Sequence, residues 1–313
     1  MRGLLLLLLA CLAASTARAE FPDRPLRLIV GYAPGGTTDI VARVVAEAMG
    51  PRLGQPILVE NRGGAGGAPA AMMVVQATPD GHTLMLHTLG PNQAAALGTP
   101  LPYDPLASFA PIGMAALGAN ALVVHPSVPA RTMGELRDLA LRSPTPLRFG
   151  TPSLGLTTAL FAQGMGIEFE EVRYRGTSAA LNDLLAGRVD AYTIALGGIL
   201  SHVQSGALRA LAIAGRTRSQ VMPDLPTTVE AGFPDVIFSS WFGLATTAGT
   251  PPDRVRRLHA VLNEVLSQPE VLRRLLGVGL DVEPSPTPED FGRFVAEDHA
   301  LWQRVARRGN LRQ

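Results

Sequence analysis

Short apolar runs alternate with amphipathic stretches along the first third of the chain. After residue 38, the side chains of Ile40, Val44 and Ala48 fall on one face of a helix, and Gly50 with Pro51 marks the end of that helix. The predicted elements are strand 26–31, helix 39–49, strand 57–60, helix 68–77 and strand 83–87. Strands that alternate with helices form a parallel sheet covered on both faces, so this region predicts an α/β lobe.

A second series of the same kind starts near Ala121, and a capping box at Thr132 and Glu135 opens its first helix. Its predicted strands are 121–125, 147–150, 171–175, 189–195 and 208–214. From Pro251 onward the pattern is helical, and we expect this part to pack on the first lobe. The series predicts a second α/β lobe.

Stretches rich in Pro, Gly and Ala, at 91–119 and 223–250, predict connections and turns between the lobes. We therefore expect lobe 1 to comprise 20–120 with 240–313, and lobe 2 to comprise 121–239, each a mainly parallel sheet flanked by helices. Ligands bind beyond the carboxyl ends of strands in such sheets, so two facing lobes predict a ligand cleft between them.

The first 19 residues have the pattern of a secretory signal peptide. Arg2 precedes a leucine run at 4–9, and the small residues Ala17 and Ala19 suit a cleavage site. Cys11 offers the alternative of a lipid anchor, which we favour less because its flanking residues fit that motif less well. We therefore expect a periplasmic protein.

Composition excludes several classes of chemistry. Cleavage after Ala19 leaves 294 of the 313 residues and removes two arginines and no acid, so the formal charge changes from +1 to −1. This balance gives no electrostatic case for binding nucleic acid. The chain has no lysine and its one cysteine is Cys11, which excludes Schiff-base enzymes, the P-loop lysine and cysteine nucleophiles. The six histidines lack zinc-binding spacing, so we expect no metal and no cofactor.

The loop at 31–39 carries the chemistry of an anion site. A strand, a Pro-Gly-Gly turn and a helix start follow one another, and the N–H groups at a helix start have no partners within the helix. Those N–H groups, the helix dipole and nearby hydroxyls favour a carboxylate or phosphate. The alternative is that the glycines only make the turn and Thr38 or Asp39 only caps the helix. The candidate residues are Tyr32, Ala33, Gly35, Gly36, Thr37, Thr38 and Asp39.

A second strand-to-helix loop, at 150–158, offers similar chemistry. Its sequence approaches the Gly-x-Ser-x-Gly nucleophile elbow of hydrolases, except that Thr151 stands where glycine is needed. A secreted serine esterase that uses Ser153 is therefore an alternative. The favoured interpretation is a helix start that holds an anion with Thr151, Ser153, Gly155 and Thr157.

Two further side chains lie near predicted strand ends. His87 ends a strand at the rim where ligands collect. Arg175 either clamps a carboxylate or lies in solvent, and for a single arginine we favour the second role. The glycines at 63–67 lack the spacing of a dinucleotide site and predict a tight loop.

Short motifs spread over the whole mature chain resemble the substrate-binding proteins of tripartite tricarboxylate transporters, the Bug receptors. They lie at 21–25, 32–39, 59–62, 64–67, 79–81, 101–104, 174–176, 183–190, 223–227, 230–232 and 241–244. Each motif is weak alone, but their order and spacing together are specific to that family.

The resemblance implies a two-lobed periplasmic binding protein of the type II-like fold, with no catalysis. Such a receptor closes on a small organic carboxylate and delivers it to integral membrane transporter subunits. The loops matching 33–39 and 151–157 would hold the ligand from opposite sides. We expect a monomer, and a ligand sensor for a membrane kinase is the remaining alternative.

The chain departs from that family's pattern mostly in the second lobe. Leu156-Thr157 stands where that family usually has Gly-Ser, and Ala159-Leu160 where it has His-Leu; Thr193 stands near a position that is often acidic or small and polar. His87 and Thr88 replace small residues and add a donor. These departures imply a less polar second half of the pocket and leave room for an aromatic or otherwise apolar carboxylate.

Overall fold

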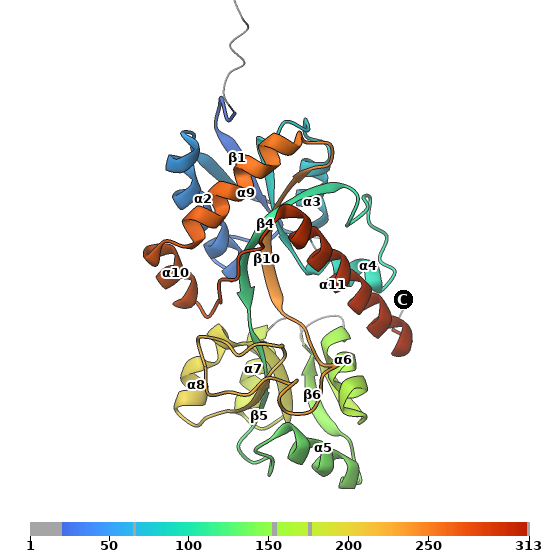
Figure 1. Ribbon diagram of the computed structural model, residues 1–313. Coiled ribbons are helices and arrows are strands. Elements are labelled where there is room, and N and C mark those ends of the chain that lie inside the picture. Colours follow the sequence, from blue (N-terminus) through green and yellow to red (C-terminus); the bar gives the residue numbers. More distant parts are fainter. Residues whose placement is uncertain (1–20, 65–66, 152–154, 175–176, 312–313) are drawn as a thin grey trace, which may run out of the picture.

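The chain folds into two lobes, each built on one five-stranded sheet (Figure 1). The computed structural model describes residues 21–64, 67–151, 155–174 and 177–311. Lobe 1 contains β1 (Leu26–Val30), β2 (Ile57–Asn61), β3 (Thr83–Thr88), β4 (Phe109–Gly118) and β10 (Ser240–Thr247). Lobe 2 contains β5 (Asn120–Val124), β6 (Leu147–Thr151), β7 (Phe169–Arg173), β8 (Ala191–Ala195) and β9 (Arg209–Ile213). This is the two-lobed α/β architecture that the sequence predicts.

Both sheets are mixed, and the antiparallel strands lie toward one edge. The order in lobe 1 is β2-β1-β3-β10-β4, and β10 runs antiparallel to both of its neighbours. The order in lobe 2 is β7-β6-β8-β5-β9, and β5 runs antiparallel to both of its neighbours. The chain crosses between the lobes at Gly118–Asn120 and again before Ser240, so both crossings lie toward this edge.

Strands β4 and β10 occupy stretches where the sequence predicts only connections and turns, so that prediction is wrong. Pro111 and Gly113 weaken the strand pattern of β4. Its partner is a segment far along the chain, with Leu244 of β10 opposite Gly113 and Phe242 opposite Ala116. Long-range pairing therefore supplies what local propensity does not.

Helices cover both faces of the lobe 1 sheet. One group contains α2 (Thr37–Leu53), α9 (Pro252–Leu266) and α10 (Pro269–Leu276), and the other α3 (Ala68–Val75) and α4 (Gly90–Ala96). The sequence predicts that α2 ends at Gly50, but the helix continues through Pro51 to a left-handed Gly54. Burial of Leu53 in the core stabilises this last turn and offsets the hydrogen bond that proline cannot donate.

The lobe 2 sheet is flanked by α5 (Met133–Arg142), α6 (Leu156–Met165), α7 (Thr177–Leu185) and α8 (Leu200–Gln204). The predicted Thr132 cap is present at α5, with Glu135 bonded to the residue before the cap. The Thr132 hydroxyl accepts the N–H of Glu135 at 3.1 Å, and the Glu135 carboxylate accepts the N–H of Arg131 at 2.6 Å.

The last helix, α11 (Pro288–Arg308), contacts both lobes rather than lobe 1 alone as the sequence predicts. Phe291 packs on Trp241 in lobe 1, whereas Trp302 packs on Phe238 in the core of lobe 2. The buried carboxylate of Asp298 accepts hydrogen bonds from α4 and from Trp302, and burial raises its pKa to about 6. The helix therefore bridges the lobes on one side of the molecule (Figure 1).

Candidate functional site

The carboxyl ends of the central strands of both lobes meet at the boundary between them. Strand β4 runs into lobe 2, and β1 and β3 point the same way because β10 is antiparallel to β3 and β4. In lobe 2, β8 is antiparallel to the departing strand β5, and β6 is parallel to β8. The loop at 31–36 and the end of β6 at Thr151 therefore lie at facing ends of the two sheets.

An internal network holds the loop before α2 in place. The carboxylate of Asp39 accepts the N–H of Gly35 at 2.9 Å, the Arg43 side chain at 3.0 Å and the Asn61 amide at 3.0 Å. The Asn61 amide also donates to the carbonyl oxygen of Tyr32 at 3.1 Å. Asp39 is 4% exposed, so these partners take the place of water.

The same network sets the charge of Asp39. The hydrogen bond from Arg43 lowers its pKa to about 2, with help from Gly35 and Asn61 and against the effect of burial. The carboxylate thus stays ionised and turned toward its own loop. The backbone N–H of Asp39 has no acceptor among the described residues.

Several N–H groups at the start of α2 remain available. Gly36 occupies the N-cap position without a side-chain cap. Within the described ranges, no protein acceptor takes the N–H groups of Thr37, Thr38 or Asp39. Ala33 through Thr37 are exposed. The helix start therefore offers N–H donors toward the lobe boundary.

A hollow of about 480 Å³ lies beside the loop that leads into this helix, and it is lined by Tyr32, Ala33, Asn61, Gly63 and nearby glycines. A Cβ on Gly63 would lie 3.2 Å from the Ala33 nitrogen, so glycine lets the two loops approach. The Tyr32 hydroxyl lies 3.3 Å from the Thr88 hydroxyl. A Cβ on Gly90 would lie 2.6 Å from the Tyr32 hydroxyl, so only glycine fits there without a shift of that side chain. Tyr32, which lines the hollow, thus rests against Gly90 and the buried Thr88.

His87 is placed differently from its prediction. Its neighbour Thr88 joins Tyr32, but successive residues of a strand point to opposite faces, so His87 faces the core. Its ring is 3% exposed and packs against Phe109 and Trp241 at centroid distances of 5.3 and 5.1 Å. Burial lowers its pKa to about 4. His87 is therefore a neutral core residue rather than a rim residue.

Three of the residues predicted in lobe 2 carry hydroxyl groups, on β6, α6 and β8. Thr151 is buried at the end of β6 and shares a 2.5 Å hydrogen bond with Thr158 of α6. Thr193 lies on the adjacent strand β8, and its buried hydroxyl has no partner within the described residues. Thr157 is half-buried in the first turn of α6. Ser153 and Arg175 lie outside the described residues.

Sequence reasoning missed one charged group beside the α6 start. Gly155, at the N-cap with φ of 75°, is so close to Glu171 that a Cβ would lie 2.6 Å from the Oε1 atom. Glu171 shares a strand face with Phe169, which packs toward α6. The period-two pattern of β7 could therefore have indicated that the Glu171 side chain points toward α6. A carboxylate at this helix start offsets part of its positive potential.

The described residues contain no group of three or more His, Cys, Asp or Glu side chains arranged to hold a metal ion. Within the same ranges, no helix has both the length and the apolar composition to cross a bilayer.

Comparisons with known proteins agree with the two-lobed fold. The family model described as tripartite tricarboxylate transporter family receptor matches residues 41–311. Protein BugT of Bordetella pertussis is 33% identical over 304 residues, which cover 95% of this chain and 93% of that protein.

Solved structures share the fold over nearly the whole chain. MatC of Rhodopseudomonas palustris with bound malate has a TM-score of 0.73 at 33% identity and covers 91% of this chain and 99% of its own. Rpa4515 of R. palustris with adipate has a TM-score of 0.76 at 31% identity, with coverage of 92% and 98%. Both matches extend across the two lobes and the helices that flank them. The chain therefore belongs to the tripartite tricarboxylate transporter receptor family, whose members are periplasmic solute-binding receptors.

Proposed function

We propose that this chain captures a small organic carboxylate between its lobes and delivers it to integral membrane transporter subunits. The observation that carries the proposal is the start of α2, where N–H donors that have no acceptor among the described residues face the boundary between the lobes. Solved relatives with malate and with adipate support a carboxylate as the ligand class. We further propose that the chain acts in the periplasm as a monomer, without catalysis or a cofactor, after cleavage following Ala19.

The two halves of the proposed site differ in charge. The α2 side offers N–H groups and the hydroxyls of Thr37, Thr38 and Thr88, whereas the α6 side carries Glu171 beside Gly155. An anionic group is favoured at α2 and disfavoured near Glu171. We therefore propose that one carboxylate binds at α2 and that the less charged remainder of the ligand contacts Thr151, Thr157 and Thr193 of lobe 2.

The strength of such a site follows from its donors. Hydrogen bonds to a charged group contribute about 1.5–3 kcal/mol each. Three or four of them cover the roughly 8 kcal/mol of micromolar binding, less the cost of ordering and closure. Ser153, Gly155 and Arg175 remain candidates on the lobe 2 side, and Ala33, Gly35 and Gly36 supply backbone on the lobe 1 side.

A thermal-shift screen tests the proposal with malate, adipate, benzoate and other organic acids, and with neutral sugars as the control. A ligand at about 100 times its dissociation constant stabilises the folded chain by about 2.7 kcal/mol, which raises the unfolding midpoint by a few degrees. We expect a shift with at least one carboxylate and none with sugars. Stabilisation by sugars or cations alone would contradict the proposal.

A further inference from the structure

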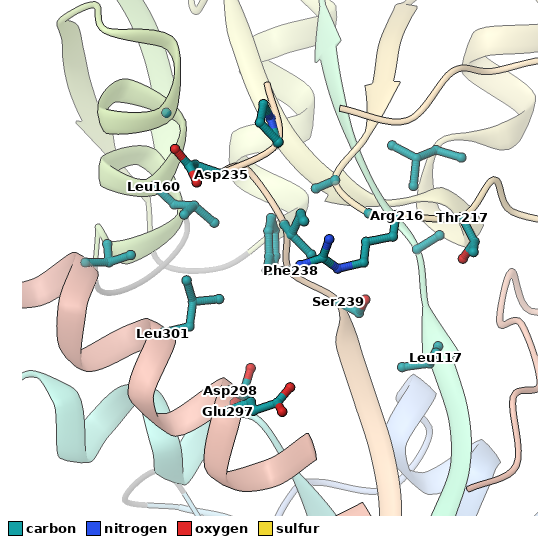
Figure 2. A pocket seen from close by; sticks show the side chains of 18 of the residues that line it. Leu117, Leu160, Arg216, Thr217, Asp235, Phe238, Ser239, Glu297, Asp298 and Leu301 are labelled. Atoms are coloured by element: carbon teal, nitrogen blue, oxygen red, sulfur yellow. The ribbon is translucent and has the colours of Figure 1, made fainter. Parts of the chain in front are cut away.

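A buried carboxylate on α11 lies at the boundary between the lobes. Asp298 is 8% exposed and lines a cavity of about 550 Å³ beside the crossings between the lobes (Figure 2). A cavity of this size admits water, so the carboxyl group can exchange its proton with solvent. None of the described residues predicted to bind ligand lines the cavity. Asp298 therefore lies outside the proposed ligand site.

Neutral donors hold both oxygens of Asp298. The Asn92 side-chain amide donates to Oδ2 at 2.8 Å, and the Trp302 indole donates to Oδ1 at 3.0 Å. The same Asn92 nitrogen donates to the carbonyl oxygen of Val295 at 3.2 Å. Asn92 is fully buried in the first turn of α4. Two hydrogen bonds therefore tie the start of α4 to α11.

The start of α4 also supports Tyr32. Gly90, the first residue of α4, is so close that a Cβ there would lie 2.6 Å from the Tyr32 hydroxyl, and the Thr88 hydroxyl lies 3.3 Å from it. Tyr32 belongs to the proposed ligand loop and is 38% exposed. Contacts this close leave no free space, so a small shift of α4 displaces the Tyr32 ring. Asp298 is thus linked to Tyr32 through Asn92 and Gly90.

Protonation of Asp298 weakens this link. Burial raises the pKa of Asp298 to about 6, and the side chains of Asn92, Trp241 and Trp302 offset part of that rise. A neutral carboxyl group is a weaker acceptor than a carboxylate, so the hydrogen bond from Asn92 weakens whichever oxygen takes the proton. The start of α4 then loses much of its tie to α11.

The other titratable groups near Asp298 can be told apart from it. The elements α4, α6, β4 and β10, which pack on α11, carry no titratable side chain. On α9, His259 is bound to backbone carbonyl oxygens. Burial lowers the pKa of His87 to about 4 and also lowers the pKa of His299. The cavity walls carry charges of both signs, on Arg216, Arg218, Asp235, Asp281 and Glu283, and α11 adds Glu297, Arg304 and Arg308.

We propose that Asp298 is a positioning residue, whose carboxylate holds the start of α4 through Asn92 and thereby fixes Tyr32 in the proposed ligand loop. Protonation releases this hold, so the position of Tyr32 depends on pH. The inference rests on the proposed function, because that function makes the Tyr32 loop part of the ligand site. Its test needs no ligand.

Nuclear magnetic resonance follows both ends of the link in one pH titration. The chain has two tryptophans, and both Trp241 and Trp302 act on the Asp298 carboxylate, so their indole N–H signals report its ionisation. The backbone N–H signals of Tyr32 and Gly90 report the other end of the link. Between about pH 5 and about pH 8, we expect all four signals of the parent chain to shift with one midpoint near pH 6.

Two variants separate the parts of the link. Asp298→Asn cannot ionise, so none of the four signals should shift near pH 6. Asn92→Ala cuts the link, so the indole signals should still titrate whereas the signals of Tyr32 and Gly90 should not. The midpoint of the indole signals should also rise in Asn92→Ala, because Asn92 lowers the pKa of Asp298.

Two controls exclude the neighbours of Asp298. Glu297→Gln removes an exposed acid one residue away, and His299→Gln removes the adjacent histidine. Both variants should titrate like the parent chain.

Stability separates a positioning role from a structural one. The pKa of Asp298 is higher in the folded chain than its ordinary value of 3.8, so its ionisation lowers the free energy of unfolding as the pH rises through 6. Asp298→Asn should therefore be at least as stable as the parent chain at about pH 7.

Three results would overturn the proposal. The first is a parent chain whose Tyr32 and Gly90 signals do not follow the indole signals, or whose indole signals do not titrate at all. The second is an Asn92→Ala variant in which Tyr32 and Gly90 still titrate. The third is a marked loss of stability in Asp298→Asn, which would make Asp298 a structural residue. A failed ligand screen would count only against the carboxylate function, because the titration uses no ligand.

Discussion

Asp39→Asn is the most direct test of the network that shapes the proposed ligand loop. The pKa of Asp39 falls from 3.8 to about 2 in the folded chain, a difference that corresponds to roughly 2.4 kcal/mol at neutral pH. Arg43 is 48% exposed and solvent screens its share, so we expect a loss of about 1–2 kcal/mol. The new amide also brings N–H donors toward the N–H groups of Gly35 and Asn61, which loosens the loop and weakens carboxylate binding.

The pH dependence of this effect has a definite sign. A pKa that is lower in the folded chain than in the unfolded chain stabilises the fold fully above about pH 4, and this contribution is lost as the pH falls toward 2. Urea unfolding at about pH 7 and about pH 3 should therefore show a large difference between parent and variant at the higher pH and a smaller one at the lower pH.

Glu47→Gln is the matched control, because Glu47 lies on the same helix and pairs with Arg274 while 61% exposed. An exposed pair of this kind contributes less than about 1 kcal/mol. A cost of Asp39→Asn no greater than that of Glu47→Gln, or equal at both pH values, would refute this role of the Asp39 carboxylate.

Two further substitutions test the core and the wall of the proposed site. The pKa of His87 falls from 6.5 to about 4, so the folded chain loses up to about 3 kcal/mol of stability as the pH drops from 6.5 to 4. His87→Phe should reduce the loss of stability that urea unfolding measures between about pH 7 and pH 4. An unchanged dependence of stability on pH would contradict the core assignment. Gly90→Ala places a Cβ 2.6 Å from the Tyr32 hydroxyl and should lower stability by about 1 kcal/mol and weaken carboxylate binding. Adding Tyr32→Phe removes the clash, so calorimetry that finds no recovery in the double variant would refute the contact.

The alternation of apolar strands and amphipathic helices determined most of the architecture. Residues 26–88 predict β1, α2, β2, α3 and β3 in order, because parallel strands buried on both faces read as apolar runs. The capping box at Thr132 and Glu135 predicted the start of α5, since both of its hydrogen bonds are local. Local chemistry also identified the N–H donors at the start of α2, because a helix start leaves them unpaired whatever surrounds it.

What the sequence could not determine depends on contacts between distant segments. Strands β4 and β10 form because they pair with each other across a long chain separation. Pro111 breaks the strand pattern of β4, so the sequence alone does not predict that strand. His87 and Thr88 are equally plausible ligand residues in sequence, and only the direction of each side chain in β3 separates a core residue from a wall residue.

Contacts between distant segments also decide which charged side chains lie beside the loops. Asp39 resembles a helix cap in sequence, but Asn61 and Arg43 turn its carboxylate toward its own loop. Glu171 reaches Gly155 only because β7 and α6 pack together. Local sequence thus determined which backbone groups lack partners, whereas tertiary packing decided which side chains stand beside them, since that depends on segments that approach one another only in the folded chain.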